Sequence, residues 1–427
     1  MRCRPATTRS RCLARSLAGV LACLIATAAA AAAPLAVVYV RLDGTARDAR
    51  ADVYEVRPPG GDPVLLLSPA KLPATFEGRI MVVRPSADGA FLLLRESGGA
   101  VIQNTRTGAT RTELGDSFGL SGDEKVVRRL QDHFWLWERA TGTLRELRTT
   151  RWGPLAWAPQ GHLLLTSSAM PAARGAPDRD LLRVVDAATS RARDLATVEG
   201  ISLAAWTRDG KAILAARQPE GQASRVILLP LSGKRRTLFT WPRRILSLAL
   251  SPDGRRVALS DDKGCYLLDR RGHQLHTLKG IPTASEDGLY GSTLSFSPGG
   301  DRLALFASEV TGEPRIFLHE SLWVADAQTG ITRRLARWEC LRFDKDAMAH
   351  GLGGWASGTP AVYVTGCNSN TSKPDYFRRR LWRMPIAPGA PVTLLFDSGP
   401  FVIDLRWWTA GAPGMKSVSK DPAHARP

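Results

Sequence analysis

One string in the sequence has the letters of a hydrolase nucleophile. Gly115-Asp116-Ser117-Phe118-Gly119 fits the pattern G-x-S-x-G, in which the serine sits on a sharp turn between a strand and a helix of an α/β domain. No helical periodicity follows Gly119, and the chain has no further residues from which to build such a domain. We therefore interpret the string as a loop and predict no catalytic residue.

The histidines offer metal chemistry as the other possibility. His273 and His276 are three residues apart in a strand-like segment, so their side chains should point to opposite faces and should not share a metal. His319 and His350 fall in two successive long connections and form an alternative metal site. Our main prediction is that the protein binds no metal and no cofactor.

The N-terminus has the layout of an export signal. Five arginines and no acidic residue stand in the first fifteen positions, and an alanine-rich apolar run follows from Leu17 to Ala33. This pattern predicts a signal peptide over residues 1–33 and a periplasmic or secreted protein, with an uncleaved membrane anchor or a lipidated Cys23 as alternatives.

Three cysteines lie outside this leader. In an oxidising compartment an odd number allows at most one internal bridge. We expect that bridge between Cys340 and Cys367, which both fall in long connections, and we expect Cys265 to be a small buried residue at the start of a strand.

The elements that position any site are short strands in a repeated order. Residues 245–278 show the unit: strand, turn Ser251-Pro252-Asp253-Gly254, strand, short connection, strand, turn ending at Gly272, strand. Alternating strands separated by glycine turns at steady spacing indicate an all-β array. The closing turn of the unit recurs eight times, at Gly61, Gly108, Gly142, Ser190, Gly233, Gly272, Gly330 and Gly389.

The two ends of the repeat region are complementary fragments. Residues 36–67 supply three strands of a unit, and residues 401–411 supply a lone first strand. The sequence therefore predicts an all-β propeller of about eight four-stranded blades, with seven as the alternative, over residues 34–411. The C-terminal strand would pair into the N-terminal blade and close the ring. Residues 412–427 are expected to be a polar tail.

Several copies of the unit carry a family resemblance. The strings SPDGRRVALS, SPGGDRLALF, TRDGKAILAA and LWVADAQTG resemble the WD40-like (PD40) repeats of the TolB family and of prolyl-oligopeptidase propellers. This resemblance implies the propeller fold and allows several functions: a scaffold, a small-ligand-binding propeller, or a metal-dependent lyase that acts on acidic oligosaccharides and would use His319 and His350.

Basic residues gather in the turns of three consecutive repeats. The first and third turns of a four-stranded blade lie on one face of a propeller, so these residues should form one electropositive patch. Such a patch would favour binding of an acidic protein, anionic lipid or acidic polysaccharide. The alternative is that these arginines only keep the surface soluble, in the place that lysine takes in other proteins. The patch consists of Arg208, Lys211, Lys234, Arg235, Arg236, Arg255, Arg256, Arg270, Arg271 and Arg302.

The opposite face should carry the long connections 281–292, 308–319, 337–353 and 366–379, which the shortest repeat does not need. Long loops on a rigid scaffold commonly carry binding sites, and aromatic and charged residues there suit protein recognition. The candidate binding residues are Tyr290, Trp338, Arg342, Phe343, Asp344, Asp375, Tyr376, Arg378 and Arg379.

Together these patterns predict an exported, non-enzymatic interaction scaffold of the cell envelope. We expect its partner to be an envelope protein or lipoprotein, with anionic lipid or acidic polysaccharide as further options. No nucleic acid is expected as a partner, and the chain is expected to be a monomer. The lyase and the small-ligand-binding propeller stay as the alternatives.

Overall fold

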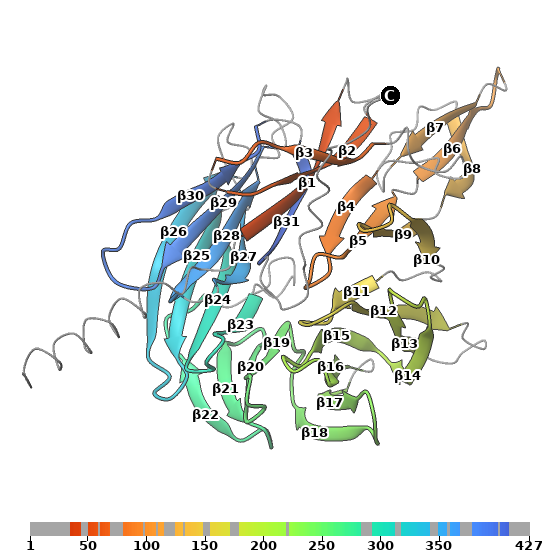
Figure 1. The fold of residues 1–427 in the computed structure, drawn as a ribbon. Coiled ribbons are helices and arrows are strands. Elements are labelled where there is room, and N and C mark those ends of the chain that lie inside the picture. The colour runs from red at the N-terminus through yellow and green to blue at the C-terminus, as the bar shows by residue number, and fades with distance from the viewer. Residues whose placement is uncertain are drawn as a thin grey trace, which may run out of the picture.

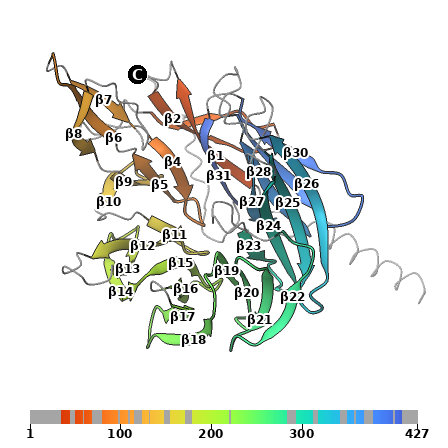
Figure 2. The same ribbon diagram turned by 180° about the vertical axis from the view of Figure 1, so that it is seen from behind.

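The computed structural model is a ring of seven four-stranded antiparallel sheets, or blades, with one further three-stranded sheet (Figure 1). Figure 2 shows the ring from behind. The described residues contain no helix with the length and apolarity that a membrane crossing requires. The structure describes residues 35–43, 50–58, 60–68, 80–96, 99–107, 110–114, 124–130, 133–147, 154–170, 179–218, 222–282, 293–311, 317–341, 349–356, 359–367, 378–399 and 402–409.

Each blade begins with a strand at the centre of the ring and ends with a strand at its outer rim. In that order, blade 1 consists of β31 (Val402–Thr409), β1 (Leu35–Asp43), β2 (Arg50–Val56) and β3 (Val64–Leu67). Blade 2 consists of β4 (Ile80–Pro85), β5 (Phe91–Glu96), β9 (His133–Glu138) and β10 (Leu144–Leu147). Blade 3 consists of β11 (Pro154–Trp157), β12 (Leu163–Met170), β13 (Arg179–Asp186) and β14 (Ala192–Glu199).

The remaining four blades repeat this plan. Blade 4 consists of β15 (Ile201–Trp206), β16 (Ala212–Arg217), β17 (Ser224–Pro230) and β18 (Arg236–Trp241). Blade 5 consists of β19 (Ser247–Leu250), β20 (Arg256–Ser260), β21 (Cys265–Asp269) and β22 (Gln274–Leu278). Blade 6 consists of β23 (Thr293–Phe296), β24 (Arg302–Thr311), β25 (Phe317–Asp326) and β26 (Thr332–Leu341). Blade 7 consists of β27 (Ala349–Trp355), β28 (Ala361–Cys367), β29 (Arg379–Pro385) and β30 (Thr393–Asp397).

The propeller predicted from the repeats is confirmed with seven blades, the smaller of the two expected numbers. The eighth unit was counted from the segment around Gly108, where β6 (Gly99–Asn104), β7 (Thr110–Leu114) and β8 (Glu124–Leu130) form the separate sheet. This sheet is inserted between β5 and β9, which still pair with each other inside blade 2. Its short strands and turns alternate as they do in a blade, so counting closing turns in the sequence cannot distinguish this insertion from a unit of the ring.

The C-terminal strand completes the N-terminal blade, as expected. β31 pairs antiparallel with β1 over the register from Leu35 opposite Thr409 to Arg41 opposite Val402. Val402 and Leu405 of this strand are buried. The two ends of the repeat region therefore meet within blade 1 as paired antiparallel strands.

The core lies in the contacts between neighbouring blades, which we call seams. Among the described residues the buried apolar side chains form seven clusters, one at each seam. In β1, Val38 and Val40 pack toward blade 2, whereas Val37 and Tyr39 pack toward blade 7. Successive side chains of a strand point to opposite faces, so both faces of a central strand must be apolar.

Candidate functional site

The turns between the first and second strands of the blades are held by their own polar side chains. In blade 5, Ser251 Oγ lies 2.6 Å from Asp253 Oδ1, which also accepts the amide hydrogen of Arg255. Ser251 Oγ accepts the amide hydrogen of Arg256, and Gly254 has a φ of 69° that favours glycine. The hydrogen bond from Ser251 is the main cause that lowers the pKa of Asp253.

The basic residues of these turns are largely exposed. The serine, threonine and aspartate side chains accept the backbone amide hydrogens of their own turns, so the arginine and lysine side chains of the same turns are not needed for these bonds. Eight of the ten predicted patch residues are exposed, while Arg256 and Arg302 are half-buried. All ten lie in or next to turns on one face of blades 4, 5 and 6, which we call the basic turn surface.

Acidic residues reduce the charge of the basic turn surface without cancelling it. The same turns hold five aspartates: Asp209, Asp253, Asp269, Asp301 and Asp326. Set against the ten basic side chains, they leave a net charge of five positive charges. Asp209 and Asp326 have lowered pKa values, because of a hydrogen bond from Thr207 and bonds from the amides of Thr329 and Gln328, respectively. These carboxylates are bound within their own turns.

On the opposite face, three of the predicted binding residues are described, and all three have contacts inside the protein. Trp338 lies on β26 rather than in a loop and is half-buried, with its ring 6.1 Å from that of Phe306. Arg378 donates to both carboxylate oxygens of Asp397, at 2.6 and 2.7 Å. Arg379 Nε donates to the carbonyl of Val402 on the closing strand.

Asp397 is the centre of this group on blade 7. It also accepts a hydrogen bond from Arg380 Nε at 2.9 Å. Burial alone would raise the pKa of Asp397, but the hydrogen bonds from Arg378 and Arg380 oppose it, and the pKa lies below its usual value. The two arginines therefore hold the last strands of blade 7 together.

The other predicted loop residues lie outside the described residues, so that part of the prediction stays a prediction: Tyr290, Arg342, Phe343, Asp344, Asp375 and Tyr376. The segment 308–319, expected as a loop, is largely strand. β24 and β25 continue to pair from Arg302 opposite Asp326 to Thr311 opposite Phe317. The polar residues in ASEVT and LHES are compatible with a pair of long strands.

The histidines and cysteines are described in part. His273 Nδ1 lies 2.9 Å from Asp269 Oδ2, and His276 Nε2 lies 2.8 Å from the carbonyl oxygen of Gln328, so the two rings have separate partners. The side chains of His319, His350, Cys340 and Cys367 lie outside the described residues. The described residues contain no cluster of three potential metal ligands. Cys265 is buried at the start of β21, as expected.

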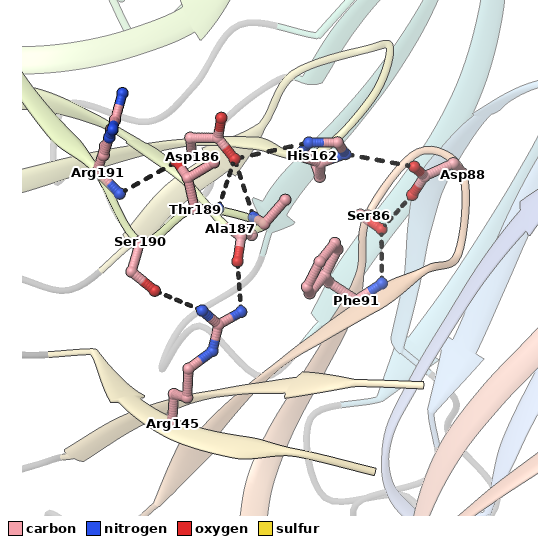
Figure 3. A network of polar contacts seen from close by, with 11 residues as sticks. Ser86, Asp88, Phe91, Arg145, His162, Asp186, Ala187, Thr189, Ser190 and Arg191 are labelled. Carbon is pink, nitrogen blue, oxygen red and sulfur yellow. Dashed lines mark hydrogen bonds and ion pairs between the residues drawn. The ribbon is translucent and has the colours of Figure 1, made fainter. Parts of the chain in front are cut away.

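The seam between blades 2 and 3 carries a polar network that the spacing of residues in the sequence does not indicate (Figure 3). His162 lies in a turn of blade 3, with Nδ1 3.7 Å from Asp88 Oδ2 of blade 2 and Nε2 3.6 Å from Asp186 Oδ1. Its ring packs on that of Phe91 at 5.5 Å. The imidazole of His162 therefore lies between a carboxylate of blade 2 and a carboxylate of blade 3.

Arg145 crosses the same seam on the outer side of the network (Figure 3). It extends from β10 of blade 2, and its two terminal nitrogens donate to Ser190 Oγ at 2.5 Å and to the carbonyl of Ala187 at 2.6 Å. Ser190 is in the left-handed region with a φ of 56°. The sequence contains one indication of this contact, since Ser190 stands where the corresponding turns of the other blades end in glycine.

The comparisons with known proteins concern the fold. No family model matches the chain, and no curated protein does. TolB from Acinetobacter baumannii is similar at 16% identity with a TM-score of 0.38, over 70% of this chain and 62% of that one. The chain therefore spans less than two thirds of that protein.

Two further solved structures are similar at low identity. The β-propeller domain of the trilobed protease from Pyrococcus furiosus shares 12% identity with a TM-score of 0.46, over 85% of this chain and 94% of that one. The acylaminoacyl peptidase from Pyrococcus horikoshii shares 11% identity with a TM-score of 0.48, over 86% of this chain and 52% of that one. The function must be argued from the chain's own residues.

Proposed function

We propose that this protein is an exported, non-enzymatic scaffold of the cell envelope that binds an acidic protein surface through the basic turn surface of blades 4 to 6. The observation that carries the proposal is the exposure of eight arginines and lysines on one face of blades 4 and 5, which the half-buried Arg302 extends to blade 6. The arginine-rich leader of the sequence supports export.

The electrostatics of the turns support binding rather than simple solubility. The aspartates accept hydrogen bonds from their own turns, so the basic side chains are the groups that remain available to a partner. Long-range attraction of this kind accelerates association and selects for an acidic partner.

An apolar side chain borders the charges and favours a protein partner over lipid headgroups or polysaccharide. Ile331 follows the closing turn of blade 6 and is 70% exposed. Protein interfaces are enriched in arginine and combine it with apolar contacts at their centre. A headgroup layer or a sugar chain would gain less from such a side chain than a protein would.

The test is charge reversal on exposed positions only. Arg255, Arg270 and Arg271 are changed together to glutamate, and the purified chain is used to capture proteins from an envelope extract. Exposed ion pairs contribute about 0.2–1 kcal/mol each, so three lost pairs should weaken the dissociation constant of the captured, repurified partner roughly 3- to 150-fold. Added salt should weaken the binding of the parent protein.

The matched control reverses three exposed arginines of blades 3 and 4 outside this surface: Arg179, Arg193 and Arg225. It changes the net charge by the same amount and should leave capture intact. Equal loss in both variants would mean that net charge alone governs binding, and the proposed surface would be wrong. Binding only to anionic vesicles or to acidic polysaccharide would replace the protein partner by that ligand.

A further inference from the structure

The seam between blades 2 and 3 lacks a contact between a ring and a glycine that two other seams share. At the seam of blades 4 and 5, a Cβ added to Gly272 would lie 2.6 Å from the side chain of Phe239. At the seam of blades 5 and 6, a Cβ added to Gly330 would lie 2.5 Å from His276. At these two seams a ring of the outer strand therefore packs directly against the glycine of the next blade's closing turn.

At the seam of blades 2 and 3 the equivalent pair is polar. Arg145 takes the place of the ring, and Ser190 takes the place of the glycine. A left-handed conformation costs a residue with a Cβ roughly 1–2 kcal/mol, and such strain is found most often at functional sites. Here the strained residue offers a hydroxyl to the guanidinium of Arg145.

A cavity of about 270 Å³ lies where Arg145 and Ser190 replace the ring and the glycine. Leu147 and Val185 form part of an apolar wall, while Arg145, Arg183, Ser168 and Ser190 contribute polar groups. Ser190 is exposed, so the cavity reaches the surface. The volume lies just under the range of about 300–1,000 Å³ that is typical of sites for drug-sized molecules, and it suits a ligand the size of one sugar ring.

Among the described residues that line the cavity, Arg145 is a guanidinium without a carboxylate partner. Arg183 Nε is paired with Asp194 at 2.6 Å, and Glu146 lies 3.1 Å from His133 Nδ1. Arg145 bonds only a carbonyl and a hydroxyl in the described part of the chain, and its buried Nε has no acceptor there. An arginine in this state favours a carboxylate, which accepts two parallel hydrogen bonds.

We propose that this cavity binds a small hydroxylated carboxylate, such as a sugar acid. Arg145 would hold the carboxylate, the hydroxyl of Ser168 would bond ligand hydroxyls, and the apolar wall would cover one face of the ring. The site lies at a different seam from the basic turn surface, so it does not depend on the proposed partner.

The experiment measures binding of glucuronate by calorimetry, with glucose as the neutral molecule of nearly equal shape and inorganic phosphate as a plain anion. Glucuronate should bind at least tenfold more tightly than either. Arg145→Gln should reduce glucuronate affinity at least tenfold. Equal binding of glucose, tighter binding of phosphate, or no binding of glucuronate would overturn the proposal.

Two further variants keep the test decisive if loss of Arg145 unfolds the seam. Ser190→Gly removes the hydroxyl and relieves the left-handed strain, so it should weaken glucuronate several-fold without lowering the melting temperature. Arg183→Gln should also weaken it several-fold. Arg191→Gln, an exposed arginine next to the same turn, should have no effect, and the reversal of Arg255, Arg270 and Arg271 should leave glucuronate binding unchanged. A loss of binding in either of these two controls would contradict the assignment.

Discussion

Ending the chain at Pro400 should open the propeller. This truncation removes β31, and β1 then loses its inner neighbour along the register that begins with Leu35 opposite Thr409. An unpaired strand edge beside a buried apolar sheet invites pairing with another molecule. We therefore expect the truncated protein to aggregate or to unfold without a cooperative transition.

The size of the effect follows from two buried side chains. Val402 is fully buried and Leu405 is 3% exposed. Burying an aliphatic side chain of this size contributes about 1.5–3 kcal/mol, so the two together contribute about 3–6 kcal/mol before any backbone hydrogen bond is counted. A typical domain has a net stability of about 5–15 kcal/mol. Losing β31 therefore removes a large fraction of the total.

The assay is urea unfolding followed by tryptophan fluorescence, with light scattering to detect aggregates. Leu405→Ala provides a milder version, for which we expect a loss of about 2–5 kcal/mol. Ending the chain at Pro413 serves as the control and should leave the transition unchanged. If the protein that ends at Pro400 unfolds at the same urea concentration as the parent, β31 does not close the ring in solution.

Two other predictions concern stability. Gly330→Ala should destabilise the protein by about 2–5 kcal/mol, because the φ of 70° disfavours a side chain and the new Cβ would clash with His276. Urea unfolding measures this loss, and an unchanged midpoint would contradict the tight packing of that seam. Asp397 has a lowered pKa in the folded protein, so its contribution is present above its ordinary pKa and is lost as the pH falls through the folded value. Asp397→Asn should therefore show a flatter decline of stability in acid than the parent, and parallel declines would refute the role of the ion pairs.

The sequence was sufficient for the fold because the period of the strands is short and regular. The alternation in β1 and the serine–aspartate or threonine–aspartate turns of blades 2, 4 and 5 are local patterns. The inserted sheet of β6, β7 and β8 shares the alternation of strands and turns, which is why a count of turns gave one unit too many. Only the pairing of β5 with β9 separates the insertion from the blade.

The packing of the tryptophans follows in part from their recurrent position in the repeat. Trp157, Trp206 and Trp355 each stand just before the first turn of their repeat, and each is half-buried at a seam. Their indole nitrogens also donate to a carbonyl of the preceding blade's inner strand, at 2.8–3.0 Å. Such a bond depends on the relative placement of two blades, which the local pattern does not contain.

The candidate cavity was not predictable for the same reason. Ser190 was visible as an exception among the closing turns, but Arg145 stands 45 positions earlier in the chain. Nothing in the spacing of the two residues shows that they meet. Their contact arises because the outer strand of one blade packs on the turn of the next, and its consequence for the cavity appears only in three dimensions.

The pairing of β31 with β1 also sets the order in which the protein can mature. A ribosome makes Leu35–Asp43 before the other six blades and Val402–Thr409 after them, so blade 1 must wait for all six before its inner strand exists. Contacts between residues so far apart in sequence form slowly, and the waiting sheet exposes an edge that can aggregate. The time between the synthesis of these two strands is therefore the period in which the protein most needs a chaperone.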